Sequence, residues 1–100
     1  MSGTALALKI ITEYNTNNVF TLARQAGVTI IYEKWYPITY GEFHKKTKTI
    51  YVNLNAPIEK KHIIAHELGH YFSELLGNNL NKIEEEKIAE DFAECMKIVI

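Results

Sequence analysis

Apolar residues recur along the chain with two different periods, and the change of period separates helices from strands. Leu6, Ile10 and Ile11 lie at helical spacing, whereas residues 28–32, "VTIIY", are β-branched or aromatic and indicate a strand. Asparagine before a segment and glycine after it mark several helix ends. The predicted elements are helices over 4–14 and 19–26, a strand over 28–32, two hairpin strands over 38–43 and 49–53, and helices over 57–76 and 82–98.

The order of these elements keeps strands and helices apart, which predicts an α+β fold. We expect a small three-stranded sheet whose β-hairpin packs on the helix of residues 57–76, with two N-terminal helices and an acidic C-terminal helix around it. One hundred residues, 47% of them hydrophobic, suit a single domain over residues 1–100.

Composition narrows the class of partner. The formal charge is −1, with acids and bases mixed along the chain, which argues against a nucleic-acid partner held by phosphate neutralisation. No stretch approaches the roughly 20 apolar residues of a membrane span, and residues 1–14 lack the basic start of a signal peptide. Cys95 is the single cysteine, so no internal disulfide is possible. We therefore expect a cytoplasmic protein without membrane or nucleic-acid partners.

The sharpest motif is H-E-x-x-H, formed by His66, Glu67 and His70 within "HIIAHELGHYF". Residues four apart on a helix lie about 40° apart around its axis, so both imidazoles can point at one ion. Zinc takes imidazole nitrogens at about 2.0–2.1 Å. Glu67 flanks the same face, where its carboxylate could reach a water molecule at the ion. A catalytic zinc site normally has a third protein ligand, which the C-terminal helix should supply.

Helical phase leaves the choice of that third ligand open. Ala89, Phe92, Ala93, Met96 and Ile100 set the apolar side of the C-terminal helix. Asp91 lies nearly opposite this side and is a poor candidate. Phase favours Glu85 slightly, because it lies near the centre of the stripe, while Glu86 and Glu90 form a pair along its edge.

Residues 40–93 resemble zinc metallopeptidases of the gluzincin class, and within it the ImmA/IrrE-type metallopeptidases. The matching segments are "KTIYVN", "IIAHELGHYF" and "EKIAEDFA", although Ile88 and Glu90 replace the glutamate and asparagine of the usual last segment. That segment also resembles the E-F-F-A-E-x-F sequence of lethal-factor-like metalloproteases, whose first glutamate binds zinc. The resemblance implies that His66, His70 and Glu86 bind Zn²⁺, and that Glu90 holds a ligand histidine by its other ring nitrogen.

The resemblance further implies hydrolysis of a peptide bond in a protein substrate, in relatives often a transcriptional repressor. Glu67 would take the proton of the attacking water, and the substrate would add a strand to an edge such as Ile38–Phe43. The alternative is a regulatory binding module that keeps zinc for folding and has no turnover.

Several further residues carry interpretations that the sequence leaves open. His62 is predicted to be solvated or to support the site without binding the metal directly. Trp35 and Tyr36 either cap the sheet or form an aromatic patch, and the apolar residues 98–100 either pack on the first helix or bury against a second copy in a homodimer. Four side chains are candidates to stabilise the transition state: Tyr40, His44, Tyr51 and Tyr71.

Overall fold

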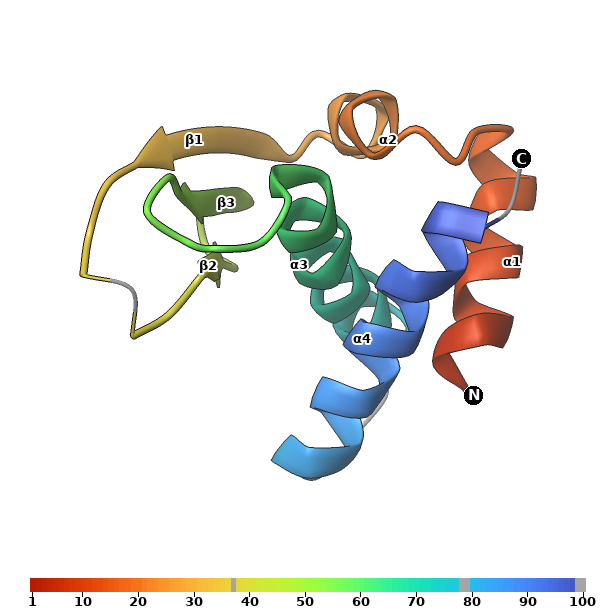
Figure 1. The fold of residues 1–100 in the computed structure, drawn as a ribbon. Helices are drawn as coiled ribbons and strands as arrows, with labels where there is room; N and C mark the ends of the chain where they lie inside the picture. The colour runs from red at the N-terminus through yellow and green to blue at the C-terminus, as the bar shows by residue number, and fades with distance from the viewer. Residues whose placement is uncertain (37, 78–79, 99–100) are drawn as a thin grey trace.

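The computed structural model describes residues 1–36, 38–77 and 80–98, and it confirms the α+β prediction (Figure 1). The order of the sheet is β1-β3-β2, with β1 parallel and β2 antiparallel to β3, so the predicted hairpin is present. The elements are α1 (Gly3–Tyr14), α2 (Val19–Gln25), β1 (Thr29–Glu33), β2 (Gly41–His44), β3 (Thr49–Asn53), α3 (Lys60–Leu75) and α4 (Lys82–Ile98).

Helix α3 lies between the sheet and the pair formed by α1 and α4 (Figure 1). Its apolar side chains therefore pack in two directions. Ile50 and Val52 of β3 are fully buried on the sheet side, and Phe92 of α4 is fully buried on the other. Each Å² of apolar surface that is buried stabilises the fold by about 25 cal/mol. This two-sided packing is therefore the main stabilising contribution. The motif helix is thus the central element of the fold.

Two predicted elements begin three residues later than expected, and the side chain of an asparagine explains each. The helix expected from residue 57 begins at Lys60, because the Asn55 amide donates to the Trp35 carbonyl at 3.0 Å instead of capping a helix. The strand expected over 38–43 begins at Gly41. Buried Asn53 donates to the Thr39 carbonyl at 2.9 Å and so holds the preceding residues in an irregular turn.

The N-terminal elements follow the predicted signals. Asn18 caps α2, because its side-chain oxygen accepts from the amides of Phe20 and Thr21 at 3.0 and 3.1 Å. Gly27 follows the helix at a φ of 76°, a conformation that favours glycine. Leu6 and Ile10 of α1 are buried in the core. This face of the first helix, which was a candidate surface for the C-terminal tail or for a second copy, therefore packs within the chain.

The side chains of residues 98–100, on which the tail and homodimer predictions depend, lie outside the described part of the chain. Within residues 1–36, 38–77 and 80–98, no helix is both long enough and apolar enough to cross a membrane.

The backbones of α3 and α4 approach closely at Gly69. A Cβ atom placed on Gly69 would lie 2.9 Å from the Ala89 Cα and 3.2 Å from the Phe92 Cβ. The obstructing atoms belong mainly to the backbone, which cannot rotate away as a flexible side chain would. The absence of a side chain at Gly69 therefore allows α4 to pack closely on α3.

We expect Gly69→Ala to lower the free energy of unfolding by about 1–2 kcal/mol, measured by urea denaturation. Overpacking costs about 1–3 kcal/mol, and the better helix propensity of alanine offsets up to about 1 kcal/mol of this. Leu75→Ala on the same helix is the control, because Leu75 is 60% exposed and its loss should change stability by less than about 0.5 kcal/mol. A Gly69→Ala protein as stable as the wild type would contradict the close packing.

Candidate metal centre

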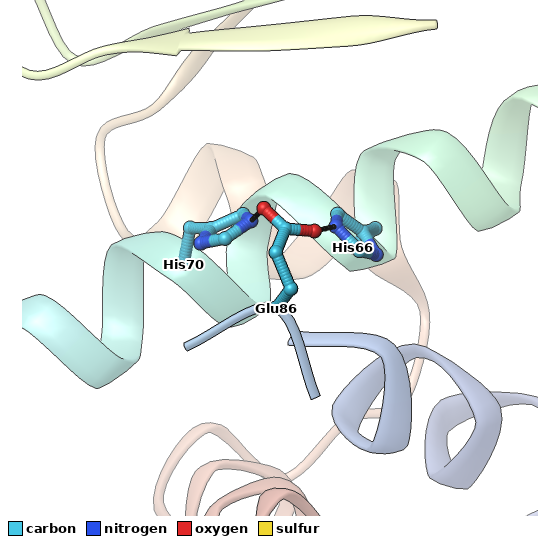
Figure 2. Close-up of side chains that lie close together, drawn as sticks. All are labelled: His66, His70 and Glu86. Atoms are coloured by element: carbon cyan, nitrogen blue, oxygen red, sulfur yellow. Dashed lines mark hydrogen bonds and ion pairs between the residues drawn. The ribbon is translucent and has the colours of Figure 1, made fainter. Parts of the chain in front are cut away.

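The side chains of His66, His70 and Glu86 converge between α3 and α4. Figure 2 shows the Glu86 carboxylate reaching from α4 to a point between the two imidazole rings of α3. Its two oxygens lie 3.0 Å from the Nε2 atom of His66 and 3.0 Å from the Nε2 atom of His70. Within the described residues, one donor atom from each side chain lies within 4.8 Å of the others. Three glutamates were left open by helical phase, Glu85, Glu86 and Glu90, and the structure places Glu86 at this point.

The remaining ring nitrogens of the two histidines face other carboxylates. His70 Nδ1 lies 2.9 Å from an oxygen of Glu85, and His66 Nδ1 lies 3.5 Å from an oxygen of Glu90. Carboxylates in these positions fix the orientation and tautomer of a ligand histidine. Glu85, which helical phase favoured slightly, thus contacts the side of His70 that faces away from Glu86. Glu90 lies beside the other ring nitrogen of His66, which is where the resemblance implied a supporting acid.

Glu67 is buried beside this group, with only 9% of the residue exposed. A Cβ atom on Gly41 of β2 would lie 3.3 Å from the Glu67 carboxylate and 2.6 Å from the side chain of Ile63. The missing side chain at Gly41 therefore leaves the space that Glu67 occupies under the edge of the sheet. Burial raises the pKa of Glu67, although His70 and His66 oppose the shift. A carboxyl group with a raised pKa is suited to accept and return a proton near neutral pH.

A cleft of about 600 Å³ is lined by His66 and Glu86 of the converging group and by Glu67. One wall is the turn into β2, with Thr39, Tyr40 and Gly41, and the other wall is α4. Glu86 is about half exposed to this cleft, while the side chains of His66 and His70 are 20% and 16% exposed. The donor groups are therefore held largely by protein but remain reachable from solvent. Such a cleft has room for a short peptide segment.

Of the four predicted transition-state stabilisers, Tyr40 is the one that lines this cleft. Tyr71 packs edge-on against Phe43, with ring centres 5.4 Å apart. His44 and Tyr51 contact each other, at 4.6 Å between ring centres, and border a separate shallow hollow with Trp35. The structure therefore separates these three from the candidate centre.

Sequence reasoning missed that the facing histidines and glutamates extend one helical turn beyond the motif, to His62 on α3 and Glu94 on α4. His62 Nε2 lies 2.5 Å from the same Glu90 oxygen that faces His66. Burial alone would raise the pKa of Glu90, but the hydrogen bond to His62 and the charges of His62 and His66 outweigh it, so the pKa is lowered. The signal was present as a spacing of four residues on both helices, at His62, His66 and His70 and at Glu86, Glu90 and Glu94.

Comparisons with known proteins do not assign the chain to a family. No family model matches the sequence, and no curated protein matches it.

We expect Glu86→Ala to weaken zinc binding by more than about a hundredfold, because it would remove a direct ligand rather than a residue that orients one. Glu85→Ala and Glu90→Ala should each weaken it by about tenfold, the lower end of the range for residues that orient a ligand histidine. Competition with a chromophoric chelator would measure all three variants on one scale. A larger loss from Glu85→Ala than from Glu86→Ala would show that helical phase was the better guide.

Proposed function

We propose that the chain is a zinc-dependent metallopeptidase that hydrolyses a peptide bond in a protein substrate. The observation that carries the proposal is that His66, His70 and Glu86 converge, and that His66 and Glu86 line one cleft together with the buried residue Glu67. Two imidazoles and one carboxylate form a donor set typical of catalytic zinc sites. Three protein donors of this kind would leave the fourth position of a zinc ion for a water molecule. When bound there, zinc would supply Lewis acidity, which lowers the pKa of a water molecule and polarises a carbonyl group.

Glu67 would act as the general base. Its carboxylate would accept a proton from the attacking water and donate it to the leaving amine. Burial supports this role because it raises the pKa of the carboxyl group toward the working range. Tyr40, which lines the same cleft, would donate a hydrogen bond to the carbonyl oxygen as negative charge develops on it.

The sheet offers a place for an extended peptide. Within the described residues, β2 is an outer strand that pairs with β3 alone, and its first residue, Gly41, lines the cleft. A peptide bound along this edge would form backbone hydrogen bonds with the sheet and pass over Glu67. The resemblance to ImmA/IrrE-type metallopeptidases suggests a regulatory protein, such as a repressor, as substrate.

A zinc-stabilised binding module without turnover is the second candidate. The observation that favours it is that the candidate ligands come from two different helices, so that a bound ion would link α3 to α4. Ion binding to the folded state alone would then stabilise a small domain by mass action.

Glu67→Gln separates the two candidates. In a peptidase, it should lower hydrolysis of a fluorogenic peptide library by at least a hundredfold, because proton transfer is lost. Zinc content and the thermal midpoint should not decrease, because the side chain keeps its shape and loses a buried charge. Glu13→Gln on α1 is the control, since the Glu13 side chain is 50% exposed and does not line the cleft, so this change should leave hydrolysis unaltered.

Equal hydrolysis by the zinc-loaded wild type and the Glu67→Gln variant would contradict the peptidase proposal. Absence of any hydrolysis in the zinc-loaded wild type, across both the library and unfolded protein substrates, would favour the binding module.

A further inference from the structure

Beyond the candidate zinc centre, imidazoles and carboxylates continue to alternate along the facing sides of α3 and α4. The two helices run antiparallel here, and each presents one ionisable side chain per turn. The contacts run in the order His70, Glu86, His66, Glu90, His62 and Glu94, at 3.0, 3.0, 3.5, 2.5 and 3.9 Å between neighbours.

The outer end of this series has an unsatisfied donor or acceptor. His62 is mostly buried, with a side chain 11% exposed, and its Nδ1 atom is covered and has no hydrogen-bond partner within the described residues. The nearest carboxylate oxygen, from Glu94, is 3.9 Å away, too far for a hydrogen bond. A buried polar atom without a partner costs about 1–3 kcal/mol. Such an atom in a native fold therefore requires an explanation, of which a bound ion is one.

The distance of 3.9 Å between His62 Nδ1 and the Glu94 carboxylate suits a bridging metal ion better than a direct hydrogen bond. Two bonds of about 2.0–2.2 Å, as zinc forms with imidazole and carboxylate, span up to roughly 4.2 Å. One ion can therefore bridge the 3.9 Å between His62 Nδ1 and Glu94. Together with Glu90, these residues present donor atoms that all lie within 4.8 Å of one another. Glu90 and Glu94 are about half exposed, so an ion can reach them from the cleft.

The local charge also favours a cation. Two carboxylates, from Glu90 and Glu94, face this point, and the neighbouring cation is Lys97, whose ammonium lies 3.6 Å from Glu94. That pair is exposed and contributes little, so the lysine can swing into solvent.

We propose that His62, Glu90 and Glu94 form a second site for a divalent transition-metal ion, with zinc as the best-suited ion. Imidazole favours zinc, and carboxylates also accept it. The site should bind zinc at least tenfold more weakly than the inner one, because it has one imidazole in place of two and its carboxylates remain more solvated. The proposal of this second site does not depend on whether the chain hydrolyses peptides.

The test is a zinc titration of the full chain by isothermal calorimetry, with bound ions counted by elemental analysis. We expect the wild type to bind two ions with different affinities. Glu94→Gln should retain the tight ion and lose the weaker one. Glu94 is 58% exposed, so this change should not disturb folding. Asp91→Asn is the matched control, because it removes one charge from the same helix away from the cluster and should retain both ions.

His70→Ala separates this proposal from the zinc-peptidase proposal. His70 contacts Glu85 and Glu86 but no member of the outer group, so its loss should remove the tight ion and leave the weaker one. A weaker ion that persists unchanged in Glu94→Gln would overturn the second site, as would a wild type that binds a single ion. A tight ion unaffected by His70→Ala would instead overturn the inner site.

Discussion

The close approach of α3 and α4 is the constraint on which the candidate centre depends. A glutamate side chain spans only a few ångströms, so Glu86 can lie between His66 and His70 only if the two helix backbones almost touch. Gly69 permits this approach beside Ala89. On the opposite side of α4, a Cβ on Gly3 of α1 would clash with the α4 backbone at Ile88 and Phe92. Helix α4 is therefore held from both sides along the segment that carries the carboxylates.

The facing charges are better explained by ligand positioning than by stability. Ion pairs with exposed carboxylates contribute about 0–1 kcal/mol each, and the glutamates that face the three histidines are about half exposed. The buried apolar residues around Phe72 and Phe92 hold the fold instead. What the pairs provide is orientation, because carboxylates next to the Nδ1 atoms of His66 and His70 leave both Nε2 atoms facing Glu86. This arrangement suits the proposed coordination of a metal ion by two imidazoles and a carboxylate.

The sequence predicted the elements, the hairpin and the core stripe of α4 because each follows from local periodicity. It could not select between Glu85 and Glu86 by phase, since phase gives an angle around one helix and not where a second helix crosses it. The resemblance pointed to Glu86, and the structure places it between the rings. The start of α3 was misplaced because Asn55 bonds across the chain to Trp35. Long-range contacts of this kind leave no periodic signal.

The central claim is that His66, His70 and Glu86 together bind zinc. X-ray absorption at the zinc edge, on protein loaded with one equivalent of zinc, tests it most directly. We expect a four-coordinate spectrum with two imidazole nitrogens at about 2.0 Å and oxygen donors in the remaining positions. The multiple-scattering features of imidazole should fall by half in His70→Ala. A spectrum without imidazole scattering, or one resembling hydrated zinc, would contradict the account.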